Sequence, residues 1–191
     1  MKILYLHGLG SSANSMTVDI LRHQFKGMHD IIAFDLYHEC DKSLTLISNY
    51  LAHNRVDLII GTSLGAYYAL CTPIDCRKIL VNPAFNPRVD LQPLLGYHEY
   101  FTKRQNEKEK SFFLEEAHLQ AFSAHKPECA DENDLIILSS KDQIIGNSLE
   151  KHLPELSFLI YEKHVKLKTT NLCGHSMSAQ FIKNELAKEI G

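Results

Sequence analysis

The sequence lacks the features that mark several classes of protein. Its five cysteines include no Cys-x-x-Cys pair, so we expect neither a disulfide framework nor a zinc site. No uninterrupted apolar stretch approaches the roughly 18 residues that cross a bilayer. The apolar residues Met1 to Leu6 are too few for a secretion signal. We therefore expect a soluble, cytoplasmic protein with reduced thiols and no membrane partner.

The sequence also lacks a strong charge of one sign. Its formal net charge is -3, which provides no broad attraction for phosphate backbones, so no nucleic-acid partner is expected. No Gly-x-x-x-x-Gly-Lys-Ser/Thr phosphate loop is present. The one dense charge run, from Lys103 to Lys110, mixes both signs and predicts a solvated loop or helix end without a binding role.

Short apolar runs alternate with amphipathic stretches, which predicts one α/β domain over residues 1–191. A continuous apolar run is typical of a parallel strand that is covered on both faces. The predicted strands are Lys2–Leu6, Ile31–Phe34, Val56–Ile60, Lys78–Val81, Leu135–Ser139 and His164–Lys168. The predicted helices are Ser15–Lys26, Ser43–Asn54, Ala66–Cys71, Phe112–Ala124, Asn147–His152 and Ser178–Ile190. This order indicates an open, mostly parallel, doubly wound sheet with helices on both faces.

Two stretches depart from this alternation. Between Pro83 and Pro127 prolines break the periodicity, and we expect residues 85–126 to leave the sheet as a small cap. The run from Leu156 to Tyr161 fits a helix or a strand equally well.

The most informative motif is the Gly-x-Ser-x-Gly pentapeptide Gly61 to Gly65, which directly follows an apolar run. A serine at a sharp turn between a strand and a helix is exposed as a nucleophile, and side chains at the two glycines would collide with the neighbouring strand and helix. The pentapeptide alone is a weak signal, because chance supplies it in unrelated chains. Its place after a predicted strand makes Ser63 the candidate nucleophile.

A serine nucleophile needs a base, an acid that orients the base, and donors for the oxyanion. In an open α/β sheet these groups lie just after the strands. Asp142 and His175 follow predicted strands and are the candidate acid and base; Asp131 and Asp134 precede their strand and should lie at its wrong end. The order serine, acid, histidine is that of an α/β-hydrolase. The backbone N–H groups of Leu9 and Leu64 are the candidate oxyanion donors.

The chain resembles the small bacterial esterases of the YqiA-like family, within the α/β-hydrolase superfamily. The resemblance is carried by the Leu-Tyr-Leu-His-Gly segment at residues 4–8, Ser11-Ser12, the elbow with the following Tyr67-Tyr68, and Val81 to Ala84. It covers nearly the whole chain but is loose from Phe85 to Asp134, and the interval between acid and histidine is longer here. The resemblance implies that Ser63, Asp142 and His175 form a triad that hydrolyses carboxylic esters or thioesters.

Two other hypotheses remain at this point. Gly8, Gly10 and Ala13 fit the dinucleotide fingerprint Gly-x-Gly-x-x-Ala, with Asp35 in the ribose position, which would make the chain a Rossmann-like nicotinamide or flavin binder. The chain could also be a non-catalytic binding protein with a hydrolase fold. We expect His7 to hold its loop by hydrogen bonding and Cys173 to be a packing residue. The favoured hypothesis is a serine hydrolase of small acyl esters or thioesters that needs no cofactor or metal.

Overall fold

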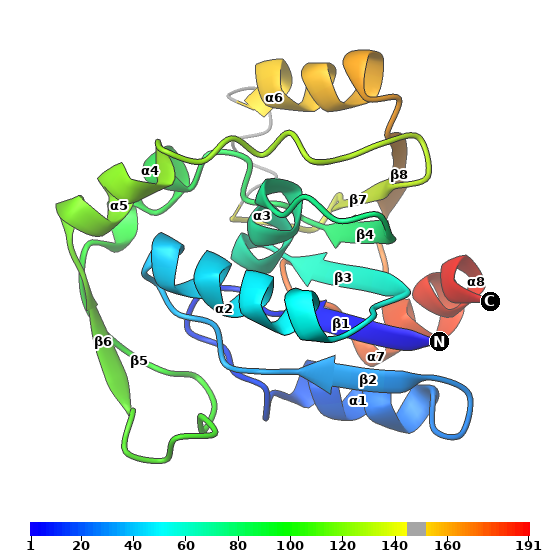
Figure 1. The fold of residues 1–191 in the computed structure, drawn as a ribbon, viewed down its shortest axis with the longest axis horizontal. Coiled ribbons are helices and arrows are strands. Elements are labelled where there is room, and N and C mark those ends of the chain that lie inside the picture. Colours follow the sequence, from blue (N-terminus) through cyan, green and yellow to red (C-terminus); the bar gives the residue numbers. More distant parts are fainter. Residues whose placement is uncertain (145–151) are drawn as a thin grey trace.

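A six-stranded sheet forms the centre of the computed structural model, which describes residues 1–144 and 152–191. Every neighbouring pair of strands in this sheet is parallel. In spatial order the strands are β2 (Asp30–Ala33), β1 (Lys2–Leu6), β3 (Leu58–Thr62), β4 (Arg77–Val81), β7 (Leu135–Ser139) and β8 (Lys166–Thr170) (Figure 1). The predicted fold class, a mostly parallel α/β sheet, is therefore confirmed.

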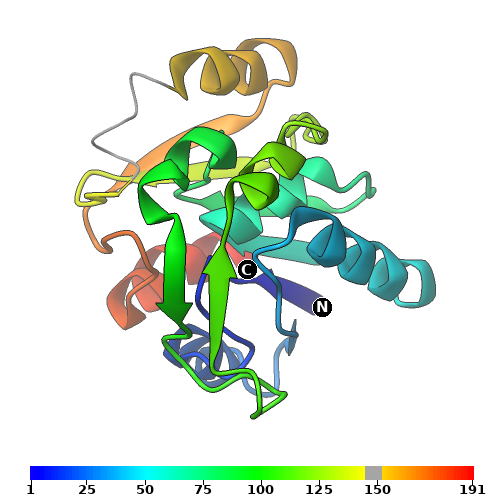
Figure 2. The same cartoon turned by 90° about the vertical axis from the view of Figure 1, so that its left-hand side faces the viewer.

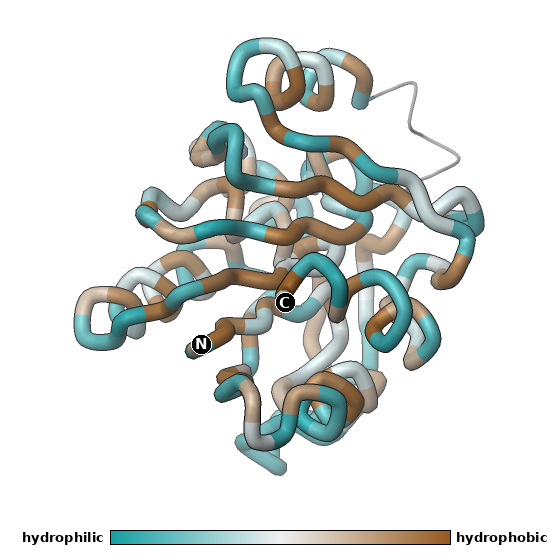
Figure 3. The backbone as a smooth tube through the Cα atoms, turned by 90° about the vertical axis from the view of Figure 1, so that its right-hand side faces the viewer, coloured by the Kyte–Doolittle hydropathy of each residue, from teal (hydrophilic) through white to brown (hydrophobic). Residues whose placement is uncertain are grey.

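Helices cover both faces of the sheet. Successive strand residues point to opposite faces, and the apolar residues on each face pack against helices. On β1, Leu4 and Leu6 join the cluster that includes residues of α2 (Cys40–His53) and α3 (Leu64–Cys71). Ile3 and Tyr5 join the cluster that includes α1 and the C-terminal helices. These helices are α1 (Met16–Gln24), α7 (Ala179–Phe181), η4 (Ile182–Leu186) and α8 (Ala187–Ile190). The hydropathy along the chain follows this burial, with apolar central strands (Figure 3).

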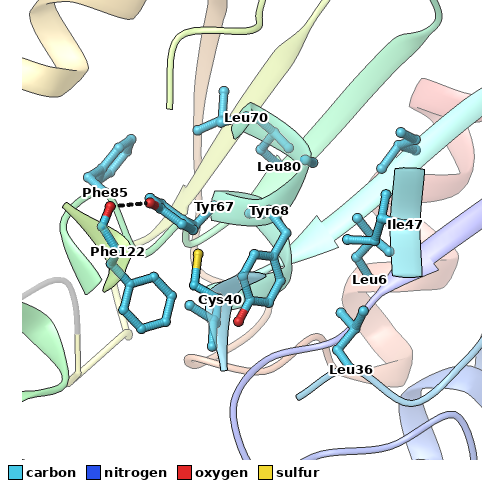
Figure 4. Close-up of a cluster of buried hydrophobic side chains, with 14 of the residues drawn as sticks. Leu6, Leu36, Cys40, Ile47, Tyr67, Tyr68, Leu70, Leu80, Phe85 and Phe122 are labelled. Atoms are coloured by element: carbon cyan, nitrogen blue, oxygen red, sulfur yellow. Dashed lines mark hydrogen bonds between the residues drawn. The ribbon is translucent and has the colours of Figure 1, made fainter. Parts of the chain in front are cut away.

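The core on the α3 face is rich in aromatic rings (Figure 4). Tyr67 and Tyr68, the pair after the pentapeptide, are both buried, and the Tyr67 ring packs edge-on to Phe122 at 5.5 Å between centroids. The Tyr67 hydroxyl donates to the Phe122 carbonyl oxygen at 2.9 Å. Through this contact the helix that follows Ser63 is tied to the end of the 85–126 segment.

Residues 85–126 leave the sheet beyond its carboxyl end and form a small separate layer. The segment contains α4 (Pro87–Asp90), η1 (Gln92–Leu94), β5 (Gly96–Glu99), β6 (Ser111–Leu114) and α5 (Glu116–Phe122). The strands β5 and β6 pair with each other as an antiparallel hairpin. Figures 1 and 2 show this hairpin apart from the central sheet. It lies on the side toward which the strands of the central sheet point.

The helix predicted over Phe112–Ala124 is wrong in its first part. Residues 111–114 alternate between exposed and buried, with Phe112 and Leu114 turned inward and Phe113 outward, as in a strand covered on one face. Only Glu116–Phe122 is helical. The pairing with β5 decides the conformation, and a pattern within one short segment does not contain that information.

Other boundaries differ by a few residues. β3 continues to Thr62 because Gly61 and Thr62 pair with Leu80 and Val81 of β4. The ambiguous run Leu156–Tyr161 is helical, within α6 (Leu153–Ser157) and the wider helical turn η3 (Phe158–Glu162). Of the predicted helix Asn147–His152, residues 147–151 lie outside the described part of the chain.

Candidate active site

Ser63 lies on the sharp turn between β3 and α3. Its backbone has φ 54° and ψ -120°, outside the conformations that a serine ordinarily adopts. The turn is held by its backbone groups: Ser63 N donates to the Val81 carbonyl oxygen at 3.0 Å, and the Ser63 carbonyl oxygen accepts from the amides of Ala66, Tyr67 and Ala84. Strain of this kind persists only where neighbouring contacts fix it, and it is concentrated at functional sites.

No side chain fits at either of the two glycines of the pentapeptide. A Cβ added at Gly61 would lie 2.6 Å from the Ala66 Cα in α3. A Cβ added at Gly65 would overlap the carbonyl oxygen of Leu6 in β1. The turn thus meets the helix on one side and the neighbouring strand on the other, as the sequence predicts.

The loop after β1 lies directly against Ser63. A Cβ added at Gly8 would be 3.2 Å from Ser63 Cβ and 3.6 Å from Ser63 Oγ. Leu9 and Leu64 both line one small cavity of about 10 Å³, together with Gly8 and Tyr100. Among the described residues, neither the Leu9 amide nor the Leu64 amide donates to a protein acceptor. Within residues 1–144 and 152–191 both N–H groups are therefore free to donate to a bound group.

Asp142 and His175 meet although 33 residues separate them in the chain. His175 Nδ1 is 2.9 Å from Asp142 Oδ2, and Asp142 Oδ1 accepts from the Ile144 amide at 2.8 Å. The Asp142 side chain is buried, whereas that of His175 is 22% exposed. A carboxylate at Nδ1 places the proton there and leaves Nε2 as an acceptor.

Ser63 and His175 are connected through hydrogen bonds of Val81 and Asn82, at the end of β4. Within residues 1–144 and 152–191 no hydrogen bond joins the Ser63 hydroxyl to His175. Such bonds are often long until substrate binds. The Val81 carbonyl oxygen accepts from Ser63 N, and the side-chain Nδ2 of the next residue, Asn82, donates to the carbonyl oxygens of Gly174 and His175.

The alternative acidic residues lie at the other end of β7. Asp134 is buried there, accepts from the Lys78 amide at 2.6 Å, and has a pKa raised by burial. Cys173 packs in the core with its pKa also raised by burial, so it behaves as an apolar residue. Asp142 is thus the carboxylate that the fold brings to His175.

The neutral imidazole of His7 holds the loop after β1. Its Nδ1 donates to the Gly8 carbonyl oxygen at 2.8 Å, and its Nε2 accepts from the Leu36 amide at 2.9 Å. Burial lowers the pKa of His7 to about 4. The sequence-based expectation of a structural role agrees with these contacts.

The positions of the dinucleotide fingerprint are occupied by the protein itself. Asp35 Oδ1 accepts from the Ala13 amide at 2.8 Å, and Asp35 Oδ2 accepts from the Gln105 amide. The Phe101 amide donates to the Gly10 carbonyl oxygen at 2.8 Å, and the Phe101 ring lies where a side chain at Gly10 would be. The loop and its acidic residue are covered by residues 101–105, which counts against dinucleotide binding.

The prediction that the charge run at 103–110 is a solvated segment is wrong for Arg104, which is buried. The Arg104 guanidinium is completely buried, 4.4 Å from the Tyr100 ring centroid and 5.0 Å from that of Tyr37. Its Nε is 2.7 Å from Glu109 Oε2 and 3.8 Å from Asp35 Oδ2. No periodicity marks Arg104 as buried, because part of its surroundings, Asp35 to Tyr37, comes from a distant segment.

Neither a metal centre nor a spanning helix is found in the described part of the chain. Its residues include no group of three or more histidine, cysteine, aspartate or glutamate side chains that could hold a metal ion. No described helix is both long and apolar enough to cross a membrane.

Solved structures share the fold over almost the whole chain. Est1E of Butyrivibrio proteoclasticus, in its complex with ferulic acid, has a TM-score of 0.67 at 14% identity, covering 99% of this chain and 89% of that one. Mouse α/β hydrolase domain-containing protein 10 has a TM-score of 0.63 at 14% identity, covering 99% and 85%. An esterase domain from Rhodothermus marinus has a TM-score of 0.62 at 16% identity, covering 98% and 85%.

A protein-family model gives the assignment at the level of sequence. The model described as an uncharacterised protein family (UPF0227) matches residues 2–174. This is the family that the resemblance in the sequence indicates, so that prediction is confirmed. The chain belongs to this YqiA-like family, and it shares its fold with solved α/β-hydrolase structures.

Proposed function

We propose that the protein is a serine hydrolase that cleaves a small carboxylic ester or thioester through an acyl-enzyme on Ser63. The observation that carries the proposal is the 2.9 Å contact between His175 Nδ1 and Asp142 Oδ2, made on the sheet edge that also carries the strained Ser63 turn. Support comes from the α/β-hydrolase fold, which solved esterases share, and from the amides of Leu9 and Leu64, which donate to no acceptor in the described part of the chain.

The residues act in an order that their chemistry sets. His175 Nε2 accepts the Ser63 hydroxyl proton as the oxygen attacks the acyl carbon, and Asp142 stabilises the imidazolium that forms. The amides of Leu9 and Leu64 donate to the tetrahedral oxyanion. His175 then protonates the departing alcohol or thiol. Water, activated by the same imidazole, hydrolyses the acyl-enzyme and returns the proton to Ser63.

A panel of p-nitrophenyl esters and acyl-CoA thioesters of graded chain length tests this function and identifies the preferred acyl group. The wild type should hydrolyse at least one member, and Ser63→Ala should lower kcat roughly 10⁴-fold or more while the far-ultraviolet circular dichroism stays unchanged. Ser48→Ala, at an exposed position of α2, is the matched control and should keep full activity. Equal hydrolysis by wild type and Ser63→Ala would remove Ser63 as nucleophile.

Two other outcomes belong to the rival hypotheses. A folded wild type that hydrolyses no member of the panel would favour a binding protein with a hydrolase fold. A rise in melting temperature with NAD(P) or a flavin would favour dinucleotide binding; the hydrolase hypothesis predicts no rise.

A further inference from the structure

Asn82 occupies a buried position between the elements that carry the candidate triad. It follows β4 directly, is 1% exposed, and has a left-handed backbone with φ 47°. Asparagine adopts this conformation more readily than most residues with a side chain. The backbone turn aims the side chain at the ends of the neighbouring segments.

The Asn82 side chain uses both ends of its amide. Its Oδ1 accepts from the Ser139 amide at 2.7 Å. Its Nδ2 donates to the Gly174 carbonyl oxygen at 2.9 Å and to the His175 carbonyl oxygen at 3.0 Å. A carboxylate of the same size accepts but does not donate, so only an amide satisfies this arrangement at neutral pH.

Ser139 extends the contact to the acid. Its Oγ donates to the Cys173 carbonyl oxygen and accepts from the Lys141 amide at 3.1 Å. Lys141 precedes Asp142, and Cys173 lies two residues before His175. Asn82 and Ser139 together therefore hold the loop of the acid and the loop of the base against each other.

The same residue is fixed relative to the nucleophile. The carbonyl oxygen of Val81, one residue before Asn82, accepts from Ser63 N at 3.0 Å, and Asn82 N donates to the Ile137 carbonyl oxygen at 2.9 Å. The path from Ser63 to the His175 backbone thus runs through two neighbouring residues of one rigid strand end.

We infer that Asn82 is a positioning residue that sets the distance and direction between Ser63 and His175. It acts through the backbone of the histidine loop and does not touch the substrate. The inference rests on the proposed function, because the geometry it maintains matters only if Ser63 and His175 react together. A misplacement of about 1 Å between reacting groups can cost roughly 10²-fold in rate.

Two variants separate the amide from the backbone conformation. Asn82→Gly removes the amide and keeps a residue that readily adopts positive φ. Asn82→Asp keeps the acceptor and places a carboxylate oxygen against two carbonyl oxygens. His164→Gly is the matched control, because His164 also has positive φ, at 59°, but is exposed and outside this network.

The measurements are kcat and KM on the best ester of the panel, with the rate and the final stoichiometry of fluorophosphonate labelling. For Asn82→Gly we expect kcat to fall roughly 10- to 100-fold with KM within about threefold. Labelling should be slowed similarly yet reach one adduct per folded molecule. Asn82→Asp should lose at least as much, and His164→Gly should match the wild type.

A purely structural role gives a different pattern. It would lower the folded fraction at the assay temperature, measured by circular dichroism, while each folded molecule kept the wild-type labelling rate; that result would overturn the inference.

If one variant does not fold, the other provides the same test. If neither folds, Ser139→Ala removes the Oγ contacts and should slow labelling, and an unchanged rate would count against the network. A wild type that is never labelled would refute the proposed function itself.

Discussion

Asp35 and Asp142 are buried carboxylates that both follow a strand of the central sheet, yet their surroundings differ. Asp35 lies on the side of the loop after β1 and accepts from the amides of Ala13 and Gln105, with the Arg104 guanidinium nearby. Asp142 lies on the other side of Ser63 and contacts His175, whose side chain is partly exposed. Position after a strand therefore marks a residue as near the site, and only its partner indicates what it does.

The two sides of Ser63 are also stabilised differently. The loop after β1 is held by the Asp35 carboxylate, with the Arg104 guanidinium beside it, and by neutral His7. The loops of the acid and the base are joined by the neutral amide of Asn82 and the hydroxyl of Ser139. We expect changes on the first side to alter stability and its pH dependence, and changes on the second to alter the rate of reaction.

Among variants of the two sides of Ser63, the largest effect is expected from Asp142→Asn. An amide does not stabilise the imidazolium and favours the wrong tautomer of His175, so kcat should fall roughly 10³- to 10⁴-fold. The free energy of unfolding should change by about 1 kcal/mol, since the side chain keeps its size. Ester hydrolysis and urea unfolding of the same preparation measure both quantities. A fall of less than tenfold in kcat would show that Asp142 is not the catalytic acid.

Asp35→Asn should produce the opposite pattern. It removes one of the two carboxylates beside the buried Arg104 guanidinium and turns an NH₂ group toward one of two backbone donors, so the free energy of unfolding should fall by about 3 kcal/mol. The kcat of the folded protein should stay within tenfold of the wild type. The control is Asp30→Asn, an exposed aspartate of β2. Equal stability of Asp35→Asn and the control would mean that Asp35 does not hold the loop after β1.

The smallest effect concerns pH and His7. The folded pKa of about 4 lies below the ordinary value of 6.5, so the unfolded chain binds more protons between these values. The His7 contribution is therefore complete above about pH 6.5 and is lost as the pH falls toward 4, amounting to about 2 kcal/mol between pH 7 and pH 5. His7→Gln should reduce this loss by that amount in urea unfolding at the two pH values, whereas exposed His23→Gln should not. An unchanged loss in His7→Gln would contradict the assignment.

The sheet could be predicted because its strands are covered on both faces. Burial on both sides produces continuous apolar runs such as Leu135 to Ser139, and parallel strands bring their carboxyl ends to one edge. That edge rule selected Asp142 over Asp134 without knowledge of any contact. It also placed His175 near the acid, although no property of the local sequence distinguishes this histidine.

The hairpin and the buried network could not be predicted in the same way. β5 (Gly96–Glu99) has no continuous apolar run, and Phe112 to Leu114 is apolar without a visible period. Arg104 and Asn82 are polar residues whose burial depends on partners from distant segments. Their contacts arise only when the sheet has assembled, so a single local pattern does not report them.

The central claim is that Ser63 is a nucleophile activated by His175. Its most direct test is to incubate the folded protein with a fluorophosphonate and identify the modified residue by mass spectrometry of its peptides. We predict one adduct per molecule, on Ser63, and none on folded Ser63→Ala. A folded wild type that acquires no adduct, or an adduct that persists in Ser63→Ala, would contradict the account.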